Sequence, residues 1–365
     1  MQQMIRLARV LSLLVVPTVF AQSPPGPAVL LDTVTLDPTK LRVHFIDIGP
    51  GLAVLIETPH DRRHIFVDGG KWSLDEMMTY VGHFVSPPLP IDIAIVTHAD
   101  TDHYKGMKRI FETYEVGQFW NTGYESDTLA NILIWAGLLQ QVDDEEGCEV
   151  YMPIEEYVEV GDTEVIDDGD TPTDPSDDVV VHYLNVDSSP PFRDPIFGRS
   201  FSEAKRRNNA SLVFRLVYKN VSFLITGDIN GRDGSHKTRS TDNEIDSEEL
   251  ELLVRHMLFP DRYNLKSTVL QAPHHGSNGS CSLPFIKAVD PDWVVITAGH
   301  QHNLPHPATL ERIGRAGVAE SRILRTDEGD STPENTSVKD PTGDDSYIFE
   351  TDGDTITRIL KVKLE

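Results

Sequence analysis

Short apolar runs separated by turns follow one another along the chain after residue 40. Residues 41–48 alternate between apolar and polar positions, a second run covers 52–57, and a third covers 64–68. Alternation with a period of two, bounded by Gly and Pro, is typical of β-strands. Residues 74–85 have the spacing of a helix. The segment 91–96 after them, apolar except for Asp92, is predicted to be a strand of a buried sheet.

The same pattern returns in the second part of the chain. Strands are predicted at 179–184, 211–218, 221–226, 267–271, 293–297, 347–350 and 355–362, and helices at 247–259 and 308–316. Because strands occur in both halves with helices between them, the pattern favours an α/β fold. We expect a sandwich of two sheets flanked by helices, in one domain over residues 41–365.

The N-terminal residues have a different character. Arg6 and Arg9 precede an apolar run, and small residues end that run near Ala21. This is the pattern of a secretory signal peptide, and it is shorter than the ~20 apolar residues of a membrane span. We expect residues 1–21 to be a signal peptide cleaved near Ala21 and residues 22–40 to be a flexible lead-in. The product would be secreted or periplasmic without stable membrane insertion, and an N-terminal anchor is the alternative.

The chain is acidic, with 58 Asp and Glu residues against 32 Lys and Arg residues and a formal net charge of −26. Such a charge repels polyanions at long range. It argues against non-specific binding to duplex nucleic acid, which needs Lys and Arg against the phosphates. Metal ions in a cleft can still make a site locally positive, so a phosphate ester remains a possible substrate.

Much of the acidity lies in two segments, residues 121–178 and 231–248. Their composition predicts solvated loop insertions. A calcium loop is the alternative for the first segment, although its spacing does not match an EF-hand.

The chain has two cysteines, Cys148 and Cys281. An oxidising compartment would permit a disulfide between them, and two separate thiols are the alternative. Neither has the C-x-x-C spacing of a metal site.

The strongest chemical pattern is His98-Ala-Asp100-Thr-Asp102-His103, on the turn after the apolar strand predicted at 91–96. Imidazole and carboxylate groups are ligands for zinc, manganese or iron. Alternate residues of a turn can face two separate ions, as a two-metal hydrolase requires. The alternative is that Asp102 only caps the following helix and the histidines are bystanders.

The pattern His-x-Asp-x-Asp-His followed by Gly106 resembles the H-x-[HD]-x-D-H-x-x-G signature of metallo-β-lactamase-fold hydrolases. Asp at the second ligand place is the variant of the hydrolase domain of ComEC-type competence DNA-uptake proteins. Further segments resemble the family in the same order: 43–51, 67–70, 208–213, 224–228, 272–277 and 302–307. The resemblance covers roughly residues 41–362. It implies a four-layer αββα sandwich in which the acidic segments are insertions.

The resemblance also implies two divalent ions, zinc or manganese, and a set of ligands. The implied ligands are His98 and Asp100 for the first ion, Asp102 and His103 for the second, and Asp228 as a bridge between both. Either His274 or His275 would complete the second position. Its place in the turn favours His275, which leaves His274 for catalysis or substrate contact.

Five further residues are expected around the ions. Asp68 would orient a ligand, and Asn208 or water would complete the first position. Ser277 and Asn303 are candidates for substrate contact. His306 would donate a proton or a hydrogen bond to the leaving group, with a loop-fixing histidine as the alternative.

Many members of the fold supply a further histidine between the first motif and the bridging carboxylate. The candidate here is His182, in the middle of an apolar strand, where a structural histidine is the better interpretation. The first position would then be open on one side, and weaker occupancy of that position is the corresponding hypothesis.

These residues predict a metallo-hydrolase. Two ions ~3.5–4 Å apart turn a shared water into hydroxide near neutral pH, and one of them polarises the oxygen under attack. The resemblance favours phosphodiester bonds, in a small molecule or a nucleic acid, with Asp102, His274 and His306 as the catalytic residues. The alternatives are a carboxyl-ester, lactone or lactam hydrolase on the same ions and a non-catalytic exported metal-binding protein. No protein partner can be inferred.

Overall fold

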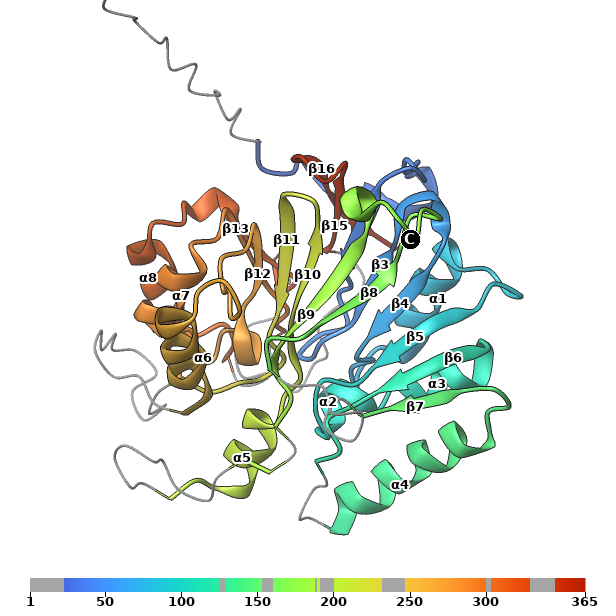
Figure 1. Cartoon of the computed structure of the whole chain (residues 1–365), viewed down its shortest axis with the longest axis horizontal. Helices are drawn as coiled ribbons and strands as arrows, with labels where there is room; N and C mark the ends of the chain where they lie inside the picture. Colours follow the sequence, from blue (N-terminus) through green and yellow to red (C-terminus); the bar gives the residue numbers. More distant parts are fainter. Residues whose placement is uncertain are drawn as a thin grey trace, which may run out of the picture.

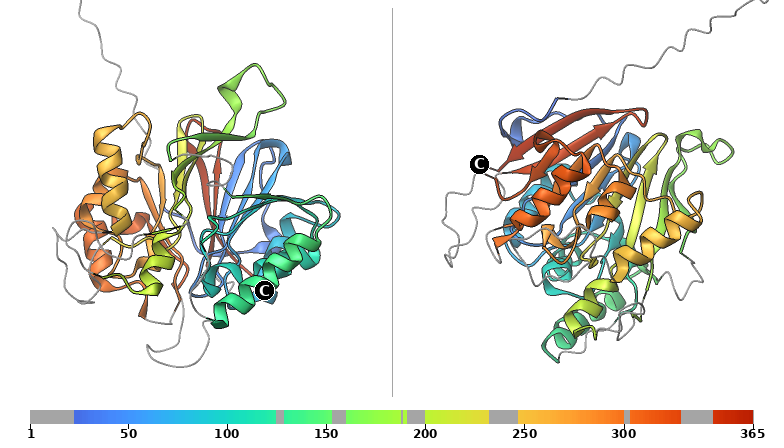
Figure 2. Two further views of the ribbon diagram at one scale, coloured as in Figure 1. Left: turned by 60° about the horizontal axis from the view of Figure 1, so that its bottom comes forward. Right: turned by 90° about the vertical axis from the view of Figure 1, so that its left-hand side faces the viewer.

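The computed structural model describes residues 23–124, 129–152, 160–187, 189–190, 200–231, 247–299, 303–328 and 345–364. These residues form two β-sheets that lie face to face between two layers of helices (Figure 1). The four layers are seen from two further sides in Figure 2. The predicted α/β sandwich of the type αββα is therefore confirmed.

The first sheet has nine strands among the described residues, and the four strands at one end of it, β4 to β7, run parallel. In spatial order the strands are β1 (Val29–Leu30), β16 (Ile356–Lys363), β15 (Ser346–Thr351), β2 (Leu41–Phe45), β3 (Val54–Glu57), β4 (His64–Val67), β5 (Ile91–Ile95), β6 (Val116–Trp120) and β7 (Glu149–Tyr151).

The second sheet has seven strands in the same described part of the chain, and β11 to β14 run parallel. In spatial order they are β14 (Ile323–Arg325), β13 (Trp293–Ile296), β12 (Val269–Gln271), β11 (Val221–Ile225), β10 (Val213–Tyr218), β9 (Val179–Asn185) and β8 (Thr163–Asp167). The hairpin predicted from the apolar runs is β10 and β11, with Tyr218 paired to Val221.

Helices cover the outer face of each sheet. The α-helices are α1 (Leu74–Phe84), α2 (Thr101–Tyr104), α3 (Met107–Thr113), α4 (Leu129–Asp144), α5 (Glu203–Asn209), α6 (Ser247–Leu258), α7 (Leu283–Val289) and α8 (Pro307–Ala316). The 3₁₀ helices are η1 (Leu31–Thr33), η2 (Pro59–Asp61), η3 (Pro175–Asp177), η4 (Pro273–Gly276) and η6 (Glu320–Arg322). Figure 1 shows α6, α7 and α8 beside the second sheet, with α1, α3 and α4 beside the first.

Three apolar clusters among the described residues hold these layers together. The largest fills the space between the sheets, where Phe45, Phe214 and Phe223 are buried. A second cluster joins the first sheet to α1, α3 and α4, and a third joins the second sheet to α6, α7 and α8. Strand β5 contributes Ile95 to the inner cluster and Ala94 to the outer one, which explains why it is apolar at every position except Asp92.

The expectation that residues 121–178 form loops is wrong for much of the segment. It contains α4, β7, β8 and η3. Trp135, Leu138 and Val142 recur at helical spacing and are buried against the first sheet, so α4 belongs to the outer layer. Asp143 and Asp144 lie exposed at the end of this helix. The acidity therefore marks a solvated surface on regular structure rather than an absence of structure.

The lead-in at 22–40 also differs from the expectation of a flexible segment. Strand β1 pairs in parallel with β16, and Leu31 is buried in the outer cluster. The predicted signal peptide lies outside the described residues, as does most of the acidic segment 231–248. None of the helices in the described ranges is both long and apolar enough to cross a bilayer.

The two cysteines do not form a disulfide. Cys281 is buried under the second sheet and Cys148 lies partly buried against the outer cluster of the first sheet. The structure therefore has two separate thiols, which was the alternative to a disulfide.

Candidate metal centre

The predicted site residues gather at one edge of the sandwich, where strands of both sheets end. His98 lies just after β5, and the short helix α2 carries His103. Asp228 lies just after β11, and η4, which follows β12, carries His275. Strands β4 and β5 run parallel, as do β11 and β12, so the segments after each pair leave its sheet at the same end.

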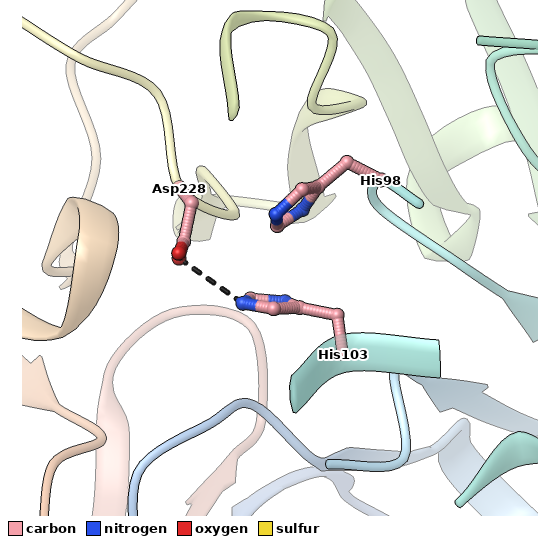
Figure 3. Close-up of side chains that lie close together, drawn as sticks. All are labelled: His98, His103 and Asp228. Atoms are coloured by element: carbon pink, nitrogen blue, oxygen red, sulfur yellow. Dashed lines mark ion pairs between the residues drawn. The ribbon is translucent and has the colours of Figure 1, made fainter. Parts of the chain in front are cut away.

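The centre of this edge is formed by His98, His103 and Asp228, whose side chains point toward one another (Figure 3). One possible ligand atom from each lies within 4.8 Å of those of the other two. His103 Nε2 lies 3.2 Å from Asp228 Oδ1. A second group of the same kind consists of Asp102, His103 and His275.

The hydrogen bonds of His103 and His275 fix the position of their protons. His103 Nδ1 lies 2.7 Å from Asp68 Oδ2, and His275 Nδ1 lies 2.8 Å from the backbone oxygen of Thr297. Both partners are acceptors, so each Nδ1 donates and each Nε2 of a neutral ring carries a lone pair. These two Nε2 atoms lie 3.3 Å apart, and each lies within 3.3 Å of Asp228 Oδ1.

Three lone-pair-bearing atoms so close together repel one another unless a positive charge lies among them. A proton can supply that charge, and so can a divalent metal ion, for which neutral imidazole and carboxylate are ordinary ligands. His98 adds a buried Nε2 atom for which the described residues provide no hydrogen-bond partner. A buried polar atom without a partner is costly, and a metal ion would satisfy it.

The side chain of Asp68, which contacts His103, is itself held in place by hydrogen bonds. It is fully buried at the end of β4, and Thr97 donates to it twice, from the backbone nitrogen (2.8 Å) and from Oγ1 (2.7 Å). Its remaining contact is the one with His103 Nδ1. This is the arrangement that the predicted orienting role requires, because a carboxylate behind a histidine ligand sets its tautomer and ring direction.

The two adjacent histidines of η4 face different ways. His274 and His275 both have left-handed backbone angles, with φ of 51° and 52°, and their rings are 74° apart. His275 faces His103 and is almost fully buried, whereas the side chain of His274 is 30% exposed and its Nε2 lies 3.8 Å from Asp228 Oδ2. The geometry therefore favours His275 as the ligand and leaves His274 at the open side, beside Asn208 (3.4 Å).

The electrostatics match this arrangement. Burial opposes the ionisation of Asp228, but the charges of His275 and His103 outweigh it and hold the pKa of Asp228 well below its ordinary value. Burial likewise opposes protonation of His103, yet Asp228 and Asp68 raise its pKa well above the usual value. For His98 burial prevails and lowers the pKa far below the usual value, so this ring is neutral.

Asp100 does not join either group. Its Oδ2 atom lies 2.9 Å from both Nε and Nη2 of Arg207 on α5, and its Oδ1 accepts from the backbone nitrogen of Thr101 (2.8 Å). It also caps α2. Burial and the neighbouring charge of Asp102 raise the pKa of Asp100, against the effect of Arg207.

The remaining candidates are spread around the edge. His306 is buried at the start of α8, and its Nδ1 atom accepts from the backbone nitrogen of Asn278 at 2.8 Å. Ser277 Oγ accepts from its own loop, at Gly279, and Asn303 is exposed. His182 lies within β9 opposite Arg215, away from the site, as expected of a structural histidine.

Three contributors were not anticipated from the sequence. Arg207 pairs with a predicted ligand, Thr97 holds Asp68, and Thr297 contributes only a backbone oxygen. Arg207 stands directly before the Asn208-Asn-Ala-Ser211 pattern, which is the one signal that could have pointed to it. A backbone oxygen carries no signal in the sequence.

Comparison with known proteins gives the family. A family model described as the metallo-beta-lactamase superfamily matches residues 46–300. The chain belongs to this superfamily. Its members are typically metallo-hydrolases.

Individual relatives agree with this assignment. ComE operon protein 3 of Bacillus subtilis (strain 168) is 26% identical over 307 residues, which are 78% of this chain and 32% of that protein. The competence protein ComA of Neisseria gonorrhoeae is 33% identical over 124 residues, which are 33% of this chain and 14% of that protein. The chain thus spans about a third of the first relative and less of the second.

Among solved structures, the metallo-beta-lactamase fold protein YhfI from Bacillus subtilis is similar with a TM-score of 0.45 and 9% identity, covering 86% of this chain and all of that one.

If the site holds two divalent cations, as the family resemblance implies, the described residues provide more ligands for one position than for the other. Asp102, His103, His275 and Asp228 offer one position a set of nitrogen and oxygen donors. His98 and Asp228 face the other position, which lacks Asp100 in this geometry. The donors suit zinc or manganese chemically.

Proposed function

We propose that this protein is an exported phosphodiesterase that cleaves phosphodiester bonds with water. The observation that supports the proposal most directly is the convergence of two Nε2 lone pairs on Asp228, which is a built cation site. Support for the substrate class comes from the competence proteins among the relatives and from the Asp at position 100 of the motif.

The bound cations would supply a water acidified to near-neutral pKa and an electrophile for the phosphoryl oxygen. The chain's own residues do the positioning. Asp68 and the backbone oxygen of Thr297 hold the rings of His103 and His275 with Nε2 facing inward. Because these contacts are buried, the ligands are set in place before substrate arrives.

His306 is suited to donate a hydrogen bond to the leaving oxygen. Its Nδ1 accepts from a backbone N–H, so the neutral ring must carry its proton on Nε2. The residue lies beside the ligand turn, because its own backbone nitrogen donates to Gly276 (3.1 Å). From this position the Nε2–H group can donate a hydrogen bond to the leaving oxygen, where negative charge develops in the transition state.

One observation favours a second candidate. The net charge of −26 disfavours a long polyanion and is compatible with a small or neutral substrate, such as a carboxyl ester, lactone or lactam. Two exposed lysines close to the motif, Lys105 and Lys108, moderate this effect locally. A non-catalytic metal-binding protein would need none of the proton-donor geometry of His306.

The test compares turnover of bis-p-nitrophenyl phosphate, a lactone and nitrocefin by protein loaded with manganese or with zinc. Asp228→Asn controls for contaminating hydrolase, and Asp92→Asn, at the opposite end of β5, controls for the loss of a carboxylate elsewhere. We expect the phosphodiester to be cleaved fastest with at least one metal. Faster cleavage of the lactone or of nitrocefin with both metals would overturn the proposed substrate class.

Export rests on the pattern around Arg6 and Arg9 and the small residues near Ala21. N-terminal sequencing of the protein recovered from the medium or periplasm tests it. A mature chain beginning shortly after Ala21 is expected, and a chain retained in the cytoplasm with its first residues intact would refute export.

A further inference from the structure

Arg207 makes a close charged contact with a member of the predicted ligand set, Asp100. It lies on α5, is 8% exposed, and directs two nitrogen atoms, Nε and Nη2, at one oxygen of Asp100, each at 2.9 Å. Its third nitrogen, Nη1, pairs with Glu203 one turn earlier. The guanidinium is therefore held between two carboxylates in a largely buried place.

This contact removes Asp100 from the metal centre. One oxygen of Asp100 is taken by Arg207 and the other by the backbone nitrogen of Thr101. For Asp100 to bind a cation, it would have to turn toward the other ligands or share its charge with a guanidinium that has little access to water. The grouping of possible ligand atoms is consistent with this. Both groups of converging side chains are made of other residues, and neither includes Asp100.

The consequence differs for the two cation positions. Around His103 and His275, the donors are complete, with Asp102 and Asp228 at hand. Around His98, Asp228 is the only carboxylate that converges within the described part of the chain. A position with fewer anionic donors binds a divalent cation more weakly.

We propose that Arg207 is a positioning residue that makes the two metal positions unequal, by holding Asp100 in an ion pair and leaving the His98 position to fill last and weakly. The inference rests on the proposed metal-dependent function, since it concerns the cations of the same site. It departs from the ligand role that the motif alone implies for Asp100.

Calorimetric titration of the metal-free protein with Mn²⁺ tests the proposal without substrate, with elemental analysis after gel filtration as the count of retained ions. The wild type is expected to show one tight event and a second event at least ~10-fold weaker. Asp100→Asn should leave both affinities within about threefold, because it removes a charge that binds no cation. Arg207→Met should free Asp100 and tighten the weak event by about tenfold.

Two variants serve as controls. Lys205→Met makes the same change of charge on the same helix and should leave both events unchanged. Arg207→Lys keeps the charge but not the paired nitrogens, so it should give an intermediate affinity at the weak position. Circular dichroism and thermal melting check that Arg207→Met is folded, and if it is not, the result for Asp100→Asn decides.

Two equal tight events in the wild type would overturn the proposal, as would the loss of one event in Asp100→Asn or an unchanged weak event in folded Arg207→Met. If the protein binds two ions with unequal affinity but does not cleave phosphodiesters, the proposed phosphodiesterase function is wrong and the inference about Arg207 stands. A protein that binds no Mn²⁺ at all would sink both.

Discussion

His275 directs its Nε2 atom at Nε2 of His103, 3.3 Å away, although the two residues are 172 positions apart in the chain. Each ring donates from its other nitrogen to a buried acceptor, so neither inward nitrogen of the neutral rings carries a proton. Two lone pairs facing each other beside a carboxylate need a positive charge among them, which a proton or a metal ion can supply. This relationship defines the candidate metal centre.

Replacing Asp228 with Asn should abolish metal binding and hydrolysis together. The carboxylate lies within 3.3 Å of both inward nitrogens, and an amide offers neither its charge nor its second anionic oxygen. We expect turnover to fall by roughly 10³-fold or more, because several kcal/mol of transition-state stabilisation depend on the ions. Elemental analysis and kcat, compared with Asp92→Asn, check this. Retained ions with full activity would contradict it.

Replacing Asp68 with Asn should weaken metal binding without removing a ligand. The amide cannot match the ionic contact with His103 Nδ1, so the ring loses its fixed direction. Removal of such a partner typically lowers metal affinity by ~10–100-fold. Competition with a chelator measures the affinity. An affinity equal to that of the wild type would show that Thr97 and packing alone position the ring.

Changing His306 to Asn should slow turnover and leave the metal in place. Asn keeps an acceptor for the backbone nitrogen of Asn278 but cannot present a proton where Nε2 does. We expect kcat to fall by about 10²-fold for a phosphodiester with an alkoxide leaving group and to change little for a p-nitrophenyl ester, whose leaving group needs no proton. Equal losses for both esters would argue for a loop-fixing role instead.

Glu248 should make the stability of the fold depend on pH. It is 3% exposed on α6, and burial, followed by the charge of Glu251, raises its pKa from the ordinary 4.5 to about 8. A carboxyl group with a raised pKa in the folded state contributes fully below its unfolded pKa. That contribution is lost as pH rises from about 4.5 through about 8.

Glu248→Gln, which cannot ionise, should therefore be more stable than the wild type at pH 9 by on the order of 5 kcal/mol and similar to it at pH 5. Urea unfolding at both pH values measures the difference. Glu311→Gln, at an exposed position on α8, is the matched control and should show no such change. If the difference in unfolding free energy between the wild type and Glu248→Gln were the same at pH 5 and pH 9, the carboxyl group of Glu248 would not be buried and neutral.

The strands and most helices could be read from the chain because their apolar spacing is local. The runs at 41–48, 52–57 and 91–96 became β2, β3 and β5, and the helix predicted at 74–85 became α1. The sequence does not predict helix α4, because the acidic residues that follow it are typical of a loop. The burial of Trp135 and Leu138 depends on packing against the first sheet.

The types of ligand and their places at strand ends were determined by the sequence alone. A strand pattern locates the turn that follows it, and imidazole and carboxylate side chains there limit the chemistry to a few metals. The tertiary structure decided which of these side chains meet. His275 rather than His274 faces His103, and Asp100 turns to Arg207, 107 positions away. Such pairings depend on how two sheets and the outer helices pack, which no local pattern encodes.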